Sequence, residues 1–341
     1  MIVPTCLIAA LRYLRNMDQR PQNQPEIISP TDRFLELAKS GVNRWWVWIL
    51  GVVLIIVIWQ GIGSVPILAA CEFVKSAQLV DFTCEDAMIV GVSSLPSFVL
   101  GAYAFVIAMF GIWAVVRVLH KKPFTNVVTA RQSFDINRVL FAMLVGFLVL
   151  AAPFLLAVTI GSDEISFQSP NAWEYVTFFM FAVVLIPFQA GFEEVLFRGY
   201  LMQGFALLTR NRVLLVLITA SIFTLPHLPN PEPWEYGVVP YVARIMTLGG
   251  FFALLTLLDG GIELATGIHI VNNLIYTLLA TTSVSAIQSP ALFLIEVDEY
   301  RLFPDIIGLW VMLGIMVAIL NWNFKWFRYS QLASFLNRQR D

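Results

Sequence analysis

Two adjacent glutamates and two histidines, all in or beside apolar segments, are the residues of this chain best suited to chemistry. Glu193 and Glu194 follow the apolar run Val176–Ile186. His227 ends a second apolar segment, and His269 lies within a third. A membrane interior strongly disfavours ionised side chains unless they pair with one another or line a polar cavity. These residues therefore mark either the place where a helix leaves the membrane or a functional site.

The chemistry that these residue types support is hydrolysis of a carbonyl bond. A carboxylate beside an imidazole can deprotonate a water molecule. A second imidazole with an amide N–H, which His269 and Asn273 offer on one helix face, can stabilise a developing oxyanion. A peptide bond is the simplest substrate for such a set. Ser221 lies on a different helix face from His227, so water is the better candidate for the nucleophile.

Helical spacing divides the two glutamates between two roles. Glu194 and Arg198 are four residues apart, so they share a helix face and can form an ion pair. Glu193 lies about 100° further round the helix and is free to face another way. The alternative is an ordinary helix end with a surface ion pair, and the spacing alone leaves both interpretations open.

The helix that carries the glutamates is expected to start inside the apolar run. Pro187 and Gly191 predict a break, after which a new helix runs over about residues 190–208. A turn then leads into the next apolar segment, which returns over residues 213–226 toward His227. Glu193 and His227 are nearly the same number of residues from that turn, so antiparallel helices place them at nearly equal depth.

The second histidine is expected to join them from its own helix. His269 lies a short distance into a segment that enters from the predicted cytoplasmic side, so the polar groups are expected to converge in the cytoplasmic half of the bundle. One conflict concerns the segment 213–226, which is short for a span. Whether it crosses the membrane fully stays open.

Three motifs in chain order resemble those of the CPBP family, which contains the type II CAAX prenyl endopeptidases and related bacteriocin-processing or immunity membrane proteins. The motifs are Glu193-Glu194-x-x-x-Arg198, Phe223-x-x-x-His227 and His269-x-x-x-Asn273. The resemblance covers roughly residues 140–325 and implies an all-helical intramembrane endopeptidase. It leaves the substrate open among a prenylated C-terminal peptide, a bacteriocin leader and a membrane regulatory protein.

The resemblance also implies roles for the motif residues. Glu193 and His227 would activate the water, while His269 and Asn273 would hold the oxyanion. The family is often described as metalloproteases, and Glu193, His227 and His269 would bind Zn²⁺ in that case. The metal-free mechanism is favoured here, and Zn²⁺ stays the alternative.

The same resemblance implies supporting roles for the other motif residues. Glu194 would pair with Arg198 and hold it in place. Phe223 would pack near the site.

Composition identifies the class of protein. Of 341 residues, 58% are hydrophobic and only 13% are charged, and the mean hydropathy is +0.77. Soluble domains carry about a quarter charged residues. We therefore predict an all-α, polytopic membrane bundle of about eight transmembrane helices. They are expected over residues 45–69, 95–119, 139–161, from about 173 onward, 213–226, 238–258, 262–280 and 304–322.

These spans divide the chain into four parts. Residues 1–43 form a cytoplasmic or interfacial segment, and residues 44–138 hold two additional spans with a cytoplasmic connector, in which His120 is expected at the membrane interface. Residues 139–325 form the protease-like core, and residues 326–341 a cytoplasmic tail. Three tryptophans, Trp45, Trp46 and Trp48, mark the interface where the first span begins.

The loops alternate in charge, which predicts orientation. Nearly all Lys and Arg fall on one side of the predicted bundle, so the positive-inside rule places both termini in the cytoplasm. We expect a multi-pass protein of a bacterial inner membrane, in contact with lipids and a peptide or membrane-protein substrate. A net charge of −2 without a basic tract indicates no nucleic-acid partner. Cys71 and Cys84 share a predicted non-cytoplasmic loop and could form a disulfide or stay as free thiols.

Two other functions fit part of the pattern. Transporters and ion pathways also contain broken helices and ionisable residues within the membrane, although no inverted repeat is evident here. A non-catalytic immunity or scaffold protein could retain the pocket. The set of two histidines, a glutamate and an asparagine suits hydrolysis better than either alternative.

Overall fold

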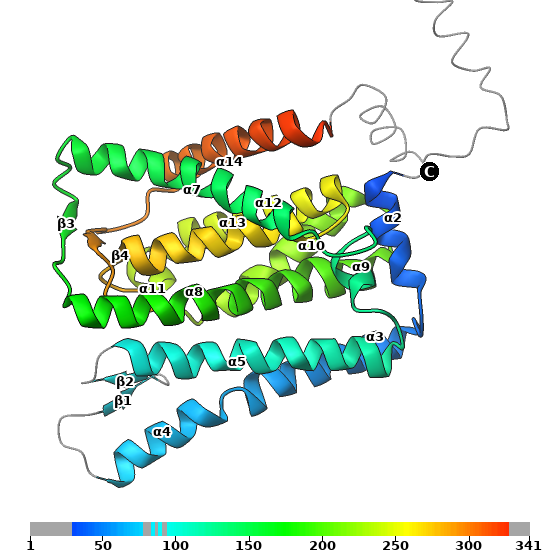
Figure 1. The fold of residues 1–341 in the computed structure, drawn as a ribbon, viewed down its shortest axis with the longest axis horizontal. Coiled ribbons are helices and arrows are strands. Elements are labelled where there is room, and N and C mark those ends of the chain that lie inside the picture. Colours follow the sequence, from blue (N-terminus) through cyan, green and yellow to red (C-terminus); the bar gives the residue numbers. More distant parts are fainter. Residues whose placement is uncertain (1–28, 78–82, 86–87, 91–93, 327–341) are drawn as a thin grey trace, which may run out of the picture.

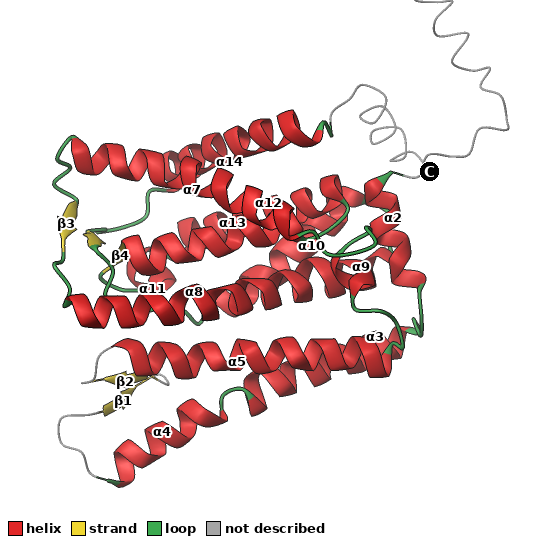
Figure 2. Ribbon diagram, viewed as in Figure 1, coloured by secondary structure: helices red, strands yellow, loops and turns green. Residues whose placement is uncertain are grey.

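The computed structural model describes residues 29–77, 83–85, 88–90 and 94–326. Residues 1–28 of the expected N-terminal segment and 327–341 of the expected tail lie outside this range. Within it the chain forms a bundle of helices that run alongside one another, with a few short strands gathered at one end (Figures 1 and 2). The prediction of an all-α polytopic bundle is confirmed, and the protein is an integral membrane protein.

The helices differ widely in length. The longer ones are, in chain order, α3 (Trp45–Ile56), α4 (Val65–Ser76), α5 (Ser94–Ala114), α7 (Ile136–Thr159), α8 (Ala172–Glu194), α10 (Arg212–Thr224), α12 (Val238–Asp259), α13 (Glu263–Leu274) and α14 (Leu302–Phe324). The short ones are α2 (Pro30–Glu36), α6 (Thr125–Val128), α9 (Met202–Ala206) and α11 (Glu232–Tyr236). Tight 3-10 turns, η1 (Leu37–Lys39) and η5 (Leu225–His227), and π-helical turns, η2 (Val57–Ile62), η3 (Val115–Leu119), η4 (Val195–Leu201) and η6 (Ile275–Leu279), extend several of them.

Among the residues that the structure describes, six helical segments are long and apolar enough to cross a membrane by length and composition. They are Trp45–Ser76, Ser94–Leu119, Ile136–Thr159, Ala172–Ala206, Val238–Asp259 and Leu302–Phe324. The predicted fifth span, Arg212–His227, is apolar but too short, and the predicted seventh, α13 with η6, is not among the six. The count of eight is therefore not confirmed, because two segments fall short of the length or hydropathy of a full span.

The predicted break at Pro187 and Gly191 is wrong. Ala172–Ala206 is one continuous helical segment that passes through Pro187, with the π-helical turn η4 beginning directly after Glu194. Proline is tolerated inside membrane helices where neighbouring groups compensate for the lost backbone hydrogen bond. The glutamates therefore lie inside a long helix and not at the start of a new one.

Polar caps set several helix boundaries. The side chains of Asp135, Asn171 and Asn211 accept hydrogen bonds from backbone N–H groups in the first turns of α7, α8 and α10. Gly260 ends α12 in the left-handed conformation with φ of 71°, which glycine adopts without strain. These caps fix where each helix starts and stops, and hence the depth of the residues that it carries.

Helix α13 is at the centre of the bundle. It packs against α7, α8 and α12, and nearly all residues from Glu263 to Val271 are buried. A Cβ at Gly267 would collide with the carbonyl oxygen of Val139, so this glycine allows α7 and α13 to approach closely. Since α13 carries His269, this close packing fixes the position of the histidine relative to α8.

The strands gather at one end of the bundle, which we call the strand end. The strands β3 (Ile165–Phe167), β5 (Phe293–Ile295) and β4 (Ala280–Thr282) form a three-stranded sheet in that order. A separate hairpin pairs β1 (Thr83–Glu85) with β2 (Met88–Val90). Cys71, on the nearby α4, is disulfide-bonded. The side chain of Cys84 lies outside the described residues, so its pairing with Cys71 stays a prediction.

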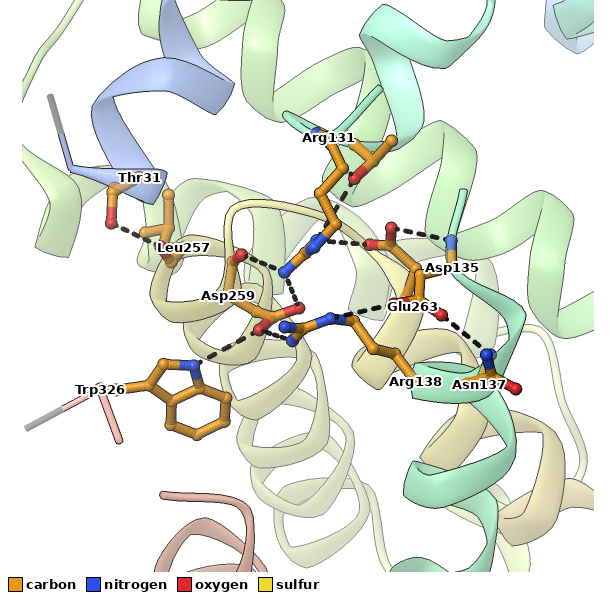
Figure 3. Close-up of polar contacts among 10 residues, drawn as sticks. Thr31, Arg131, Asp135, Asn137, Arg138, Leu257, Asp259, Glu263 and Trp326 are labelled. Carbon is orange, nitrogen blue, oxygen red and sulfur yellow. Dashed lines mark hydrogen bonds and ion pairs between the residues drawn. The ribbon is translucent and has the colours of Figure 1, made fainter. Parts of the chain in front are cut away.

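The opposite end of the bundle, where α2 lies and where α7 and α13 begin, we call the basic end (Figure 1). Figure 3 shows its centre, in which Arg131 and Arg138 both reach Asp259. Arg131 Nη2 is 2.8 Å from Asp259 Oδ2, and Arg131 Nη1 is 3.3 Å from Glu263 Oε2. Trp326 Nε1 also donates to Asp259 Oδ1 over 3.4 Å. This network ties α7, α12, α13 and the segment after α14 together.

His120 directly follows the candidate span Ser94–Leu119 and is packed inside the basic end, while its expected position at the membrane interface stays a prediction. Its side chain is fully buried, with Nδ1 2.8 Å from the Val42 carbonyl oxygen and Nε2 2.7 Å from the Tyr200 hydroxyl. Burial lowers the pKa of His120 to about 4, because it disfavours the charged imidazolium. His120 is therefore neutral near pH 7. Its two contacts connect the end of η3 with the segment before α3 and with η4.

Candidate active site

The two glutamates on α8 occupy different environments although they are adjacent. Glu194 is fully buried, and its Oε1 is 2.8 Å from Nη1 of Arg198, which is fully buried too. Glu193 is 6% exposed and lines a cavity of about 530 Å³. The division into one paired and one available carboxylate, expected from helical spacing, agrees with this geometry.

Arg198 connects α8 to two neighbouring helices. Its Nη2 donates a 3.1 Å hydrogen bond to the carbonyl oxygen of Gly249 on α12. Its guanidinium lies 4.2 Å from the centre of the Phe223 ring on α10, a cation–π contact in a dry environment. Phe223 thus packs against the site, as the sequence suggested, and Arg198 holds three helices in register.

His269 lies between the two glutamates. Its Nδ1 is 2.7 Å from Glu194 Oε1, and its Nε2 is 3.7 Å from Glu193 Oε2. Because a carboxylate accepts, Nδ1 carries the proton in this contact, and Nε2 is turned toward Glu193 and the cavity. The Phe252 ring stacks on the imidazole at 4.9 Å with an interplanar angle of 17°. The bond to Glu194 was not anticipated, because nothing in the spacing of two distant segments reveals it.

His227 reaches the cavity from the end of α10. Its Nδ1 lies 2.8 Å from the carbonyl oxygen of Phe223, which leaves Nε2 as the nitrogen for other partners. Glu193 and His227 line the same cavity, and no hydrogen bond joins these two described side chains. A small molecule between them, such as water, would have to carry any proton transfer.

Asn273 lines the cavity one helical turn beyond His269. Its Oδ1 accepts a 3.0 Å hydrogen bond from Nδ2 of Asn272, so its own amide N–H₂ is the group available for donation. The structure therefore brings together in one cavity the four residues that the sequence singled out for catalysis. Whether they perform the implied roles stays a prediction.

Two carboxylate oxygens in this cavity, Oε2 of Glu193 and Oε2 of Glu232, have no hydrogen-bond partner among the described residues. Oε2 of Glu193 is buried and accepts no hydrogen bond, while buried polar atoms in proteins are normally paired. Oε2 of Glu194 and Nε of Arg198 are also buried without a hydrogen-bond partner among the described residues. An unpaired buried acceptor that faces a cavity is the group expected to bind a ligand or water.

The suggested zinc ligands are not arranged as a metal-binding group in this structure. A Zn²⁺ site needs three protein ligands about 2.0–2.2 Å from one point. Glu193, His227 and His269 do not form such a group, and neither do any other three His, Cys, Asp or Glu side chains among the described residues. Nδ1 of His227 is directed at a backbone carbonyl and Nδ1 of His269 at Glu194, which leaves Nε2 of each ring as the nitrogen available to a ligand in the cavity.

Several polar residues of the cavity were missed at the sequence level. Gln189 lies one turn before Glu193 on α8, and Arg244, Tyr276 and Glu232 line the wall toward the strand end. Arg244 could have been found, because an arginine inside an apolar span is unusual. Trp59 also lines the cavity, so the first span contributes to the site although it lies outside the predicted protease-like core.

Comparison with known proteins identifies the central part of the chain. Residues 172–275 match the family model described as type II CAAX prenyl endopeptidase Rce1-like. The uncharacterized protein YyaK of Bacillus subtilis (strain 168) is 33% identical over 190 residues, which is 55% of this chain and 63% of that protein. The alignment thus spans less than two thirds of this relative's length. No solved structure matches the chain significantly.

Proposed function

Residues 172–275 match the Rce1-like family of type II CAAX prenyl endopeptidases, and from this premise we propose that the chain belongs to that family and is an intramembrane endopeptidase. The observation that carries the proposal is the single cavity lined by Glu193, His227, His269 and Asn273. The matched region contains all four residues and the helices α8, α10, α12 and α13 that hold them.

The proposed reaction begins with a water molecule between Glu193 and His227. Oε2 of Glu193 accepts a proton from this water, and the oxygen attacks the carbonyl carbon of the scissile peptide bond. Asn273 Nδ2 and, in its doubly protonated form, His269 Nε2 donate hydrogen bonds to the oxyanion. The C–N bond then breaks as the amine nitrogen takes a proton from Glu193 or His227.

Glu194 and Arg198 support this reaction without touching the substrate. Glu194 accepts from Nδ1 of His269, which orients the ring so that Nε2 faces the cavity. Arg198 balances the charge of Glu194 and fixes it to α10 and α12. No step is routed through a metal ion, because no three ligands among the described residues are arranged to hold one.

The test is cleavage by the purified protein in detergent. A library of lipidated C-terminal peptides and membrane-protein segments is offered to the wild type, Glu193→Gln and the control Glu235→Gln, which changes an exposed glutamate on α11. The wild type and the control are expected to cleave a common set of peptides, and Glu193→Gln to cleave none. Cleavage by Glu193→Gln at the wild-type rate contradicts the proposal.

A second comparison decides between a metal-free and a metal-dependent reaction. A strong zinc chelator is expected to leave the cleavage rate of the wild type unchanged. Loss of activity that added zinc restores would make the histidines metal ligands. Rapid flux of ions or solutes through proteoliposomes, equal in the wild type and Glu193→Gln, would instead favour a transporter.

A further inference from the structure

The cavity is more exposed at the strand end than around the catalytic residues. Around them Glu193, Phe197, Phe223, Phe252 and His269 are at most 6% exposed, while His227 is half-exposed and its neighbour Pro226 is exposed. At the opposite end the lining comes from half-exposed or exposed residues of β4, of the loop that follows it and of the segment before α14, namely Thr281, Thr282, Ser285, Ala286, Ile287, Gln288, Val297 and Tyr300. The cavity therefore opens at the strand end, where Figure 1 places β4 and α11.

The wall between the two ends is polar. Arg244 is the one Lys or Arg that lines the cavity, and no ion pair joins it to a carboxylate among the described residues. Oε2 of Glu232 is buried there without a hydrogen-bond partner. Charged side chains within a membrane protein face its interior or a water-filled cavity. This wall therefore supports a hydrated path from the strand end to Glu193.

The basic end offers no comparable path. Asp259 and Glu263, at most 4% exposed, are held by Arg131 and Arg138 across the ends of α12 and α13 (Figure 3). Helix α2 covers the neighbouring surface, and its Asp32 pairs with Arg212 at 2.8 Å. None of these basic-end residues lines the cavity.

The two ends also differ in charge. Lys and Arg concentrate at the basic end, at positions Arg33, Lys39, Arg44, Arg117, Lys121, Lys122, Arg131, Arg138, Arg210, Arg212 and Lys325. The strand end carries mainly acidic residues, namely Asp163, Glu164, Glu174, Glu232, Glu235, Glu296, Asp298, Glu299 and Asp305. The positive-inside rule assigns the basic end to the cytoplasm. The mouth of the cavity then faces away from the cytoplasm.

We propose that the cavity takes its substrate from the extracytoplasmic face, so that the substrate is a polypeptide segment exposed on that face. That this segment is hydrolysed rests on the endopeptidase function proposed above. The access route depends only on the fold and its orientation in the membrane. The expectation of cleavage in the cytoplasmic half of the bundle is kept, and only the direction of access is new. The scissile bond lies toward the basic end, but the chain that carries it arrives from the opposite side. The acidic surroundings of the mouth favour neutral or basic segments.

Cysteine accessibility tests the route without a known substrate. In a Cys6→Ser background, single cysteines replace Gln189 beside the catalytic residues, Thr282 at the mouth and the exposed Ser133 at the basic end. A charged, membrane-impermeant methanethiosulfonate is applied to intact bacterial cells and to inverted membrane vesicles. Gln189→Cys and Thr282→Cys are expected to react in intact cells, and Ser133→Cys only in inverted vesicles.

Each other outcome overturns the proposal. Labelling of Ser133→Cys in intact cells would show that the basic end is outside. A Gln189→Cys that reacts only in inverted vesicles would show cytoplasmic access, and one that reacts from neither side would show that no aqueous path exists. Asn272→Cys repeats the measurement from α13, in case the α8 variant does not fold.

The same route is then tested with catalysis. A peptide cleaved in detergent is added outside proteoliposomes, in which Ser133→Cys labelling reports the fraction of molecules of each orientation. Cleavage is expected only by molecules whose strand end faces the peptide. If no peptide is ever cleaved, the endopeptidase function fails while the labelling result still decides the access route.

Discussion

Buried carboxylates at the basic end and in the cavity differ in their hydrogen bonding. At the basic end Asp259 receives hydrogen bonds on both oxygens, from Arg138, Arg131 and Trp326. In the cavity Oε2 of Glu193 accepts no hydrogen bond from the described residues and has only the 3.7 Å contact with His269 Nε2, although this residue is nearly as buried. A fully paired buried charge contributes to the structure, whereas an unpaired one has a cost that only a ligand or water relieves. The comparison separates side chains that hold the bundle together from those that we assign to catalysis.

Glu193→Gln is expected to give the largest effect on activity and almost none on stability. Loss of a general base lowers the turnover rate by about 10²–10⁴-fold. The free energy of unfolding changes little, because Oε2 accepts no hydrogen bond from the described residues and its contact with His269 Nε2 is long, at 3.7 Å. Peptide cleavage and thermal unfolding in the same detergent check this. A large fall in the unfolding temperature would assign Glu193 to the structure.

Glu194→Gln is expected to affect both properties. The substitution leaves Arg198 buried without its countercharge, and breaking a buried ion pair costs about 3–5 kcal/mol. It also weakens the hydrogen bond that His269 Nδ1 donates, so the turnover rate per folded molecule should fall. Denaturant unfolding with parallel kinetics measures the two losses. An unchanged turnover rate would show that the contact with His269 is not needed.

Asp259→Asn is expected to reduce stability alone. It weakens the contacts of Arg131 and Arg138, which are partly exposed, so the cost should be only about 1–3 kcal/mol. The turnover rate of the folded fraction should equal that of the wild type, because the network lies outside the cavity. A selective loss of turnover would mean that the basic end communicates with the site.

Phe252→Leu is expected to have a moderate effect on turnover. The ring stacks on His269, and its loss allows the imidazole to tilt away from Glu193 and the oxyanion. We expect a fall of about tenfold in the turnover rate with a small change in KM. Phe251→Leu, which alters the buried neighbour outside the cavity lining, is the matched control. Equal effects of the two substitutions would argue against a positioning role for the ring.

His120 predicts a small pH dependence of stability. The pKa of its folded form is about 4, while an unfolded histidine titrates near 6.5. As the pH falls, the unfolded chain binds the proton first, so the contribution is complete above about pH 6.5 and is lost between about pH 6.5 and 4. Unfolding temperatures measured across this range should decline, and His120→Gln should reduce the slope. An identical slope in the variant would assign the pH dependence to other groups.

Contacts within one helix were predictable from the sequence, whereas contacts between distant segments were not. The face shared by Glu194 and Arg198, and that shared by His269 and Asn273, follow from helical periodicity alone. The break at Pro187 was wrong, because the cost of a proline in a membrane helix depends on neighbours that the local sequence does not reveal. The burial of His120 was not predicted for a related reason, since its partners Val42 and Tyr200 lie far from it in sequence.

The sequence by itself determined the membrane class, the apolar segments, the charge asymmetry and the residues within one helical turn of each other, because each depends only on composition or on the repeat of the helix. Only the tertiary structure decided that His269 bonds to Glu194, that Arg131 and Arg138 close one end, and that the cavity opens at the other. Those features depend on how far each helix is rotated and shifted against its neighbours. That is fixed by the packing of whole helical faces and by close approaches such as Gly267 to Val139.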